Sequence, residues 1–126
     1  EDVLIPLKFD NLHPIIFRSN SDIKTIASEN IVVVRTKPDI SNSLARYIRA
    51  YFLTNIGIQS VIDLSKPVTK WKANYIKISD LKSLVIKVPS KDRQLEIAES
   101  LENAIHAFSI SQYCFERVNS LMKDLI

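Results

Sequence analysis

The stretch "SLVIKVPSKDRQLEIAESL", residues 83–101, decides the fold because it joins two kinds of structure without a spacer. Its apolar run, residues 84–88, favours a strand, which Pro89 ends since proline has no N–H for a ladder hydrogen bond. Ser90 can then cap a helix, and a helical pattern with Gln94 in its first turn follows at once. The sequence therefore predicts a tight joint between a β-rich body and a helix.

The helix after Ser90 is predicted to be long, since no proline or glycine occurs from residue 92 onward. Spacings of seven give two apolar rows, which predict a coiled-coil seam and a partner-helix interface over about four heptads. The first row is Leu101, Phe108, Phe115 and Met122, and the second is Ile97, Ala104, Ser111, Val118 and Leu125. A helix of this length extends about 50 Å. A small body cannot cover all of it, so we expect the distal half to pack on another helix.

Residues 1–90 are predicted to form a small β-rich body with one covering helix. The predicted strands are residues 2–8, 13–17, 31–36 and 75–78, and residues 31–36, the most β-branched run, are expected at the centre of the sheet. The covering helix spans "SLARYIRAYFLTNIG", where Ser41 or Ser43 can cap it and Gly57 can end it in the left-handed conformation. The fold class is therefore α+β, with a body over residues 1–90 and a helix over residues 91–126.

Composition indicates a soluble globular domain, because 46% of the 126 residues are apolar and 25% are charged. The single cysteine, Cys114, cannot form an internal disulfide, and no apolar run reaches the roughly 18 residues of a membrane span. We therefore expect an intracellular, cytoplasmic protein. Because the chain starts at Glu1 without a methionine, it is expected to be cut from a longer protein.

The charge distribution divides the chain. Residues 1–91 carry 14 Lys and Arg against 8 Asp and Glu, whereas residues 92–126 carry 3 against 6. A basic body suits a polyanion, and an acidic helix with apolar stripes suits another protein.

These elements resemble the target recognition domain, and the helix that follows it, of type I restriction-modification DNA specificity subunits. The resemblance is most specific over residues 76–105, "IKISDLKSLVIKVPS" followed by "RQLEIAESLENA", and looser over residues 2–62. In the family a strand ending in proline runs into a helix with glutamine in its first turn. The matching positions here are Ile86, Val88, Pro89, Gln94, Ile97, Ala98 and Leu101.

The resemblance implies sequence-specific recognition of double-stranded DNA by a non-catalytic subunit. It further implies that the helix pairs with a second, similar helix, which fixes the distance between two recognition halves and docks the methyltransferase subunits. The restriction subunits would be further partners. No cofactor is expected on this chain, because S-adenosylmethionine would bind the methyltransferase partner.

The candidate DNA contacts are basic and polar side chains. No acidic residue occurs between Asp63 and Asp80, whereas lysines flank a tryptophan there, as expected of a loop that displaces counterions from phosphate. The candidates in this interval are Lys66, Lys70, Trp71, Lys72, Asn74 and Lys77, of which Asn74 could read adenine. Arg46 and Arg49 are candidates for backbone phosphate. All of these residues could equally be a solvated surface.

Three alternatives stay open. The same domain could end a fused N6-adenine DNA methyltransferase, or the chain could be a protein-interaction module with an incidental basic face. Asp39, Asp80 and Lys82 imitate a PD-(D/E)xK nuclease, although their setting favours turn and cap chemistry. His13 and His106 lack partners at metal-ligand spacing, and Cys114 has only Arg117 as a basic neighbour, so neither a metal site nor a thiol nucleophile is expected.

Overall fold

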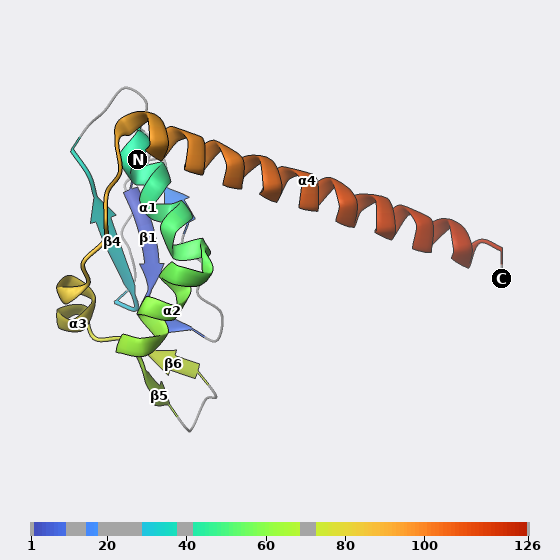
Figure 1. The fold of residues 1–126 in the computed structure, drawn as a ribbon. Coiled ribbons are helices and arrows are strands. Elements are labelled where there is room, and N and C mark those ends of the chain that lie inside the picture. Colours follow the sequence, from blue (N-terminus) through green and yellow to red (C-terminus); the bar gives the residue numbers. More distant parts are fainter. Residues whose placement is uncertain (1, 10–14, 18–28, 38–41, 69–72, 126) are drawn as a thin grey trace, which may run out of the picture.

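The computed structural model of the chain describes residues 2–9, 15–17, 29–37, 42–68 and 73–125. The fold is α+β, with two small antiparallel sheets, three helices on the body and one long C-terminal helix (Figure 1). The elements in chain order are β1 (Asp2–Pro6), β2 (Lys8–Phe9), β3 (Ile15–Phe17), β4 (Ile31–Arg35), α1 (Ser43–Leu53), α2 (Asn55–Leu64), β5 (Lys66–Val68), β6 (Ala73–Tyr75), α3 (Ile78–Ser83) and α4 (Lys91–Lys123).

The first sheet has the strand order β3-β1-β4, and all of its pairs are antiparallel. Val3 and Ile5 of β1 are fully buried and form the core with Phe52 of α1. The prediction that residues 31–36 lie at the centre is wrong, because β1 is central and β4 pairs with β1 alone among the described strands. A β-branched run fits any half-buried strand, and Val33 on the outer face of β4 is 41% exposed.

The second sheet has the strand order β2-β6-β5 and lies at the other end of the body from the start of α4 (Figure 1). The chain passes from the first sheet to the second at Leu7, which is buried. The Leu7 N–H donates to the carbonyl oxygen of Asn30 (2.8 Å), and its own carbonyl accepts from the N–H of Ile76 (2.9 Å). Residues 75–78 are not the predicted strand, because β6 ends at Tyr75 and α3 begins at Ile78.

The covering helix consists of two helices that meet at Thr54. The Thr54 hydroxyl donates to the carbonyl of Tyr51 (2.6 Å) and accepts from the N–H of Gly57 (3.2 Å), so one side chain ends α1 and caps α2. Gly57 therefore lies inside α2 and does not end a helix in the left-handed conformation. It must lack a side chain because a Cβ there would lie 1.9 Å from the carbonyl oxygen of Tyr51. The residue before α1 is Asn42, with a φ of 49°, and Ser43 is buried in the first turn.

Residues 84–90 are extended but form no strand, so the strand predicted at 84–88 is wrong. Leu84 and Ile86 pack against the core, whereas Val85 is 89% exposed and Val88 is 53% exposed. The segment thus alternates between core and solvent as a strand would, but it forms no strand pairing with any of the described strands. Its anchor is Tyr47 of α1, whose hydroxyl donates to the carbonyl oxygen of Lys87 (2.6 Å).

The long C-terminal helix is confirmed, and Ser90 is its first flanking residue as predicted. The Ser90 side chain makes no capping hydrogen bond, although its carbonyl accepts from the N–H of Gln94 (2.9 Å). The Gln94 side chain is buried and donates from Nε2 to the carbonyl oxygen of Pro89 (2.9 Å). Gln94 thus ties the first turn of α4 to the proline before it, which makes the joint short and fixed.

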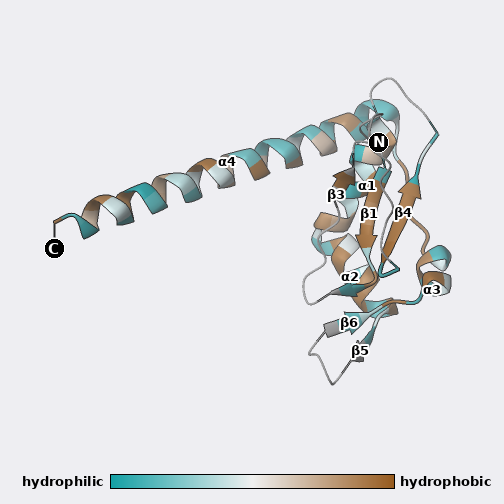
Figure 2. Ribbon diagram, turned by 180° about the vertical axis from the view of Figure 1, so that it is seen from behind, coloured by the Kyte–Doolittle hydropathy of each residue, from teal (hydrophilic) through white to brown (hydrophobic). Residues whose placement is uncertain are grey.

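The first three turns of α4 pack on α1, and the rest projects away from the body (Figure 1). Ala98 of α4 and Ala50 of α1 are both buried, and such small side chains let two packed helices approach closely. From Asn103 to Leu125 every residue is exposed. Figure 2 shows hydrophilic and hydrophobic residues mixed along this length. No helix in the described part of the chain is both long enough and apolar enough to cross a membrane.

Candidate nucleic-acid interface and interaction helix

Two lysines flank a tyrosine on one face of the second sheet. Lys8 of β2 and Lys66 of β5 both lie directly opposite Tyr75 of β6, and residues paired in this way share a face of the sheet. Two strand spacings separate the lysine backbones by about 10 Å. Both lysines are exposed, as is Lys77 after β6, whereas Tyr75 between them is half-buried against the core. We call Lys8, Tyr75 and Lys66 the basic row; the sequence did not single out Lys8 because a two-residue strand leaves no periodic signal.

Asn74 lies on the opposite face of this sheet. Asn74 pairs with Phe9 and Pro67 and immediately precedes Tyr75 in β6. Successive residues of a strand point to opposite faces of the sheet. Lys66 and Asn74, both expected to contact DNA, therefore cannot approach the same surface through one face of the sheet. Lys70, Trp71 and Lys72 belong to the connection between β5 and β6 and lie outside the described residues.

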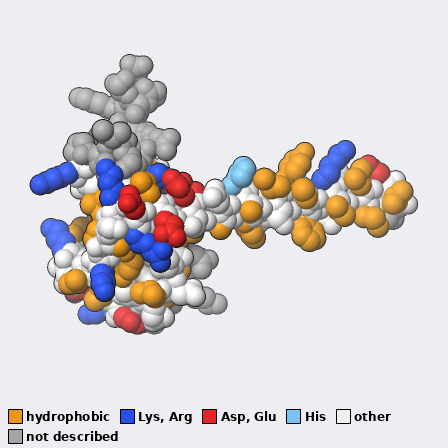
Figure 3. Space-filling model, turned by 45° about the horizontal axis from the view of Figure 1, so that its top comes forward, with side chains coloured by type: hydrophobic (Ala, Val, Ile, Leu, Met, Phe, Trp, Pro, Cys, Tyr) orange, Lys and Arg blue, Asp and Glu red, His pale blue; other side chains and the backbone are white. Residues whose placement is uncertain are grey.

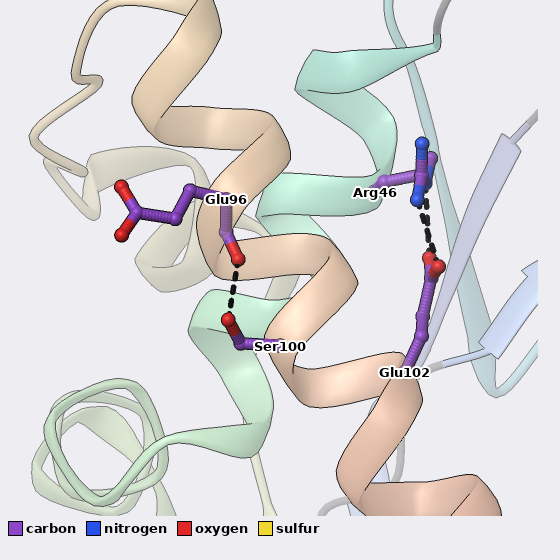
Figure 4. Close-up of polar contacts among 4 residues, drawn as sticks. All are labelled: Arg46, Glu96, Ser100 and Glu102. Atoms are coloured by element: carbon purple, nitrogen blue, oxygen red, sulfur yellow. Dashed lines mark hydrogen bonds and ion pairs between the residues drawn. The ribbon is translucent and has the colours of Figure 1, made fainter.

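Arg46 is engaged within the molecule. Its guanidinium makes a two-pronged ion pair with Glu102 of α4, from Nε to Oε1 (2.9 Å) and from Nη2 to Oε2 (2.7 Å), as Figure 4 shows. The pair lies where α4 leaves the body. Contact of Arg46 with phosphate stays a prediction, and Glu102 already occupies two of the five N–H donors of its guanidinium. Arg49 is half-buried, and its Nε is buried with no hydrogen-bond partner among the described residues.

Most residues of the predicted seam of α4 are exposed to solvent. Leu101 is half-buried, whereas Phe108 and Phe115 are 63% and 69% exposed, and the small Ala104 and Ser111 are exposed too. Val118, Met122 and Leu125 continue the row, with Leu125 80% exposed. The expectation that the body cannot cover the distal half is confirmed for the described residues. Packing on a second helix stays a prediction.

The apolar surface of α4 is wider than the predicted seam. Ile105, Ile110, Tyr113 and Leu121 lie outside the two rows of sevens and are 37%, 52%, 69% and 50% exposed. Figure 3 shows hydrophobic side chains on more than one side of the projecting helix. Pairing with a single helix along a narrow seam would leave part of this surface in water.

An apolar groove of about 480 Å³ lies at the joint between the body and α4. We call it the joint groove; its lining residues are Tyr47, Tyr51, Thr54, Ile56, Lys87, Pro89, Arg93 and Ile97. Ile56 of α2 is 75% exposed there, and Ile97 belongs to the predicted seam. The sequence did not reveal this groove, because its walls come from α1, α2, the extended segment and α4.

Two titratable groups have shifted pKa values with clear causes. Burial raises the pKa of the Tyr47 hydroxyl above its ordinary value, and proximity to Tyr51 adds to the shift. The hydrogen bonds from Arg35 lower the pKa of Asp2, at distances of 2.9 and 2.7 Å across β1 and β4. Neither group faces the basic row, so the shifts belong to the body's own structure.

Two of the three nuclease candidates, Asp80 and Lys82, lie in the short helix α3. Asp80 lies in the first turn of α3, and Asp39 is outside the described residues. No group of three or more His, Cys, Asp or Glu side chains suited to a metal ion occurs among the residues that the structure describes. His106 and Cys114 are exposed on α4, and His13 is not described.

The chain matches no family model, no curated protein and no solved structure at a significant level.

Proposed function

We propose that the chain recognises double-stranded DNA as part of the specificity subunit of a type I restriction-modification system, and that it is not itself catalytic. The body contacts DNA through its second sheet and the β5–β6 connection. The helix α4 pairs with a second helix and sets the distance to another recognition half.

The proposal rests on the positions of the basic row and of α4 at opposite ends of the body. The basic row lies at one end of the body, on the second sheet, and α4 leaves from the other end (Figure 1). A recognition unit on a spacer needs this separation, because DNA and the second helix must bind without competing for one surface.

The joint supports the same function. Pro89 and Gln94, two of the residues that carry the family resemblance, hydrogen-bond to each other, and Tyr47 holds the segment before them. A fixed joint transmits the orientation of the body to α4. A loose joint would blur the spacing between two half-sites.

The partners follow from the resemblance. Methyltransferase and restriction subunits would supply the chemistry, with S-adenosylmethionine on the methyltransferase, in the cytoplasm. A fused N6-adenine methyltransferase that ends in this domain would use the same DNA contacts, and the full-length gene distinguishes the two.

Salt dependence of DNA binding tests the proposal. Each phosphate contact adds about 0.9 to the slope of log affinity against log salt, so changing both Lys8 and Lys66 to Ala should lower that slope by about 2. Changing Lys70 and Lys72 to Ala should do the same. Arg117→Ala with Lys123→Ala removes the same charge from α4 and should leave the slope unchanged. Binding is measured by fluorescence anisotropy on a duplex pool of random sequence.

Two results would count against the proposal. If the wild-type chain shows no salt-dependent affinity for duplex DNA, the protein-interaction module is the better interpretation. If it binds but both lysine pairs behave like the control on α4, DNA is contacted elsewhere on the body.

A further inference from the structure

The joint groove is continuous with the seam of α4. Ile97 lines the groove and stands in one row of sevens with Ala104, Ser111, Val118 and Leu125. Arg93, also in the groove, stands in a third row of sevens with Ser100, Ala107, Cys114 and Leu121. A helix that follows the seam toward the body therefore runs into the groove.

Small and aromatic side chains along the seam select one antiparallel register. Around a two-fold axis, the residues of one row lie opposite those of the other row on the partner copy. One register places Phe115 opposite Ala104 and Phe108 opposite Ser111. Shifting the pair by one heptad places Phe115 opposite Ser111 but Phe108 opposite Val118. The first register is favoured because each exposed aromatic ring then meets a small residue.

This register brings the end of the partner's α4 to the joint groove. Met122 of one copy lies opposite Ile97 of the other, so residues beyond Met122 extend toward Arg93. The side chains on that side of the last turns are all apolar, namely Val118, Leu121, Met122 and Leu125, which are 54%, 50%, 54% and 80% exposed. They match the apolar walls of the groove. The carbonyl groups at the end of the partner's helix carry partial negative charge, which suits Lys87 and Arg93 on the rim.

We propose that the joint groove of each copy receives the last turns of α4, Val118–Leu125, from a second copy of the chain. This inference rests on the proposed pairing of α4 and adds its register and its end contact. The contact also accounts for the apolar character of Leu121 and Leu125 at the tip of a projecting helix. Two such contacts, one at each end, would hold the two bodies at a set distance.

Cross-linking between named positions tests the proposal. In a chain with Cys114→Ser, the pair Ile56→Cys and Leu125→Cys should give a covalent dimer with a short bismaleimide. The two positions cannot react within one chain, because Leu125 lies about 42 Å along the helix from Ile97 at the groove. The matched control replaces Ile56→Cys by Val85→Cys, which is 89% exposed and outside the groove, and should not cross-link. Leu125→Cys alone should not cross-link either, whereas it would in a parallel pair.

Sedimentation of charge variants gives an independent readout. Ile56→Glu should raise the dissociation constant of the dimer at least about tenfold, and Val85→Glu should leave it unchanged. A wild-type chain that is monomeric at high micromolar concentration overturns the pairing itself. If the wild-type chain dimerises, Ile56→Glu does not weaken the dimer and Ile56→Cys does not cross-link, the groove contact is wrong. The pairing of α4 would still stand in that case.

Discussion

Tyr47 joins two functions in one side chain, because its ring is part of the buried face of α1 and its hydroxyl donates to the carbonyl of Lys87. The sequence predicted the helix that carries Tyr47. It could not predict the hydrogen bond, because the acceptor is a backbone atom 40 residues away. Gln94 is similar: its position in the first turn was visible, but its bond to Pro89 depends on how α4 sits on the body.

Tyr47→Phe should lower the free energy of unfolding by about 1 kcal/mol at neutral pH, since it removes one hydrogen bond and little apolar contact. Burial raises the folded-state pKa of Tyr47 above the ordinary value of 10.0. The stabilisation from this group is therefore complete below about pH 10 and is lost as the pH rises through the folded-state pKa. Tyr47→Phe should weaken the alkaline loss of stability, as measured by urea unfolding at a series of pH values.

Tyr113→Phe is the matched control, because Tyr113 is 69% exposed on the projecting helix. It should change neither the stability of the body nor its pH dependence. If Tyr47→Phe is as stable as the wild type at neutral pH and declines identically above pH 10, Tyr47 does not hold the joint.

At the scale of elements, α4 could be predicted from the sequence because nothing interrupts its pattern over 33 residues. The unpaired, extended conformation of residues 84–88 could not be predicted from the sequence. Alternation reports which side chains face the core and not whether the backbone pairs with a second strand. The break at Thr54 was missed for a related reason. The apolar spacing continues through it, and Thr54 separates α1 from α2 by its extended backbone and its capping hydroxyl.

The candidate interface was predictable only in part. A lysine-rich interval between Asp63 and Asp80 is visible in the sequence, but the row of Lys8 beside Tyr75 and Lys66 depends on pairing between strands far apart in the chain. The same pairing places Asn74 on the other face. Arg46 was predicted as a phosphate ligand because its partner Glu102, 56 residues later, could not be foreseen.

Phe108→Asp together with Phe115→Asp should convert the chain from a dimer to a monomer without unfolding the body. Full burial of such side chains is worth about 1.5 to 3 kcal/mol each, which an aspartate forfeits. Sedimentation equilibrium measures the association, and the unfolding transition of the body serves as the internal check. His106→Asp with Ser109→Asp adds the same charge outside the predicted seam and should weaken association less. Equal effects of the two double variants would contradict the seam.

On the scale of the whole molecule, the chain has a basic body and an acidic helix, and the structure places the basic row and the seam on different elements. Two recognition bodies held apart by paired helices would meet DNA at two sites. The distance between those sites would follow from the length of α4 that stands clear of each body.

The proposed role requires that the chain bind DNA without cutting it. Supercoiled plasmid incubated with the chain and magnesium or manganese should stay supercoiled on an agarose gel. Asp80 lies in a helical turn and not in a strand that could carry a metal-binding acid beside Lys82. Nicking that is lost in Asp80→Ala but retained in Asp63→Ala would restore the nuclease alternative.

The ion pair between Arg46 and Glu102 lies where α4 leaves the body, because every described residue after Glu102 is exposed. Beyond it the helix acts as a lever arm about 35 Å long. A rotation of the helix axis by one degree about this point displaces the C-terminal end of α4 by about 0.6 Å. A rotation of ten degrees would displace it by more than the rise of one helical turn. The direction of the arm therefore depends on the contacts near this point, which are the part-buried ion pair and the packing of Ala98.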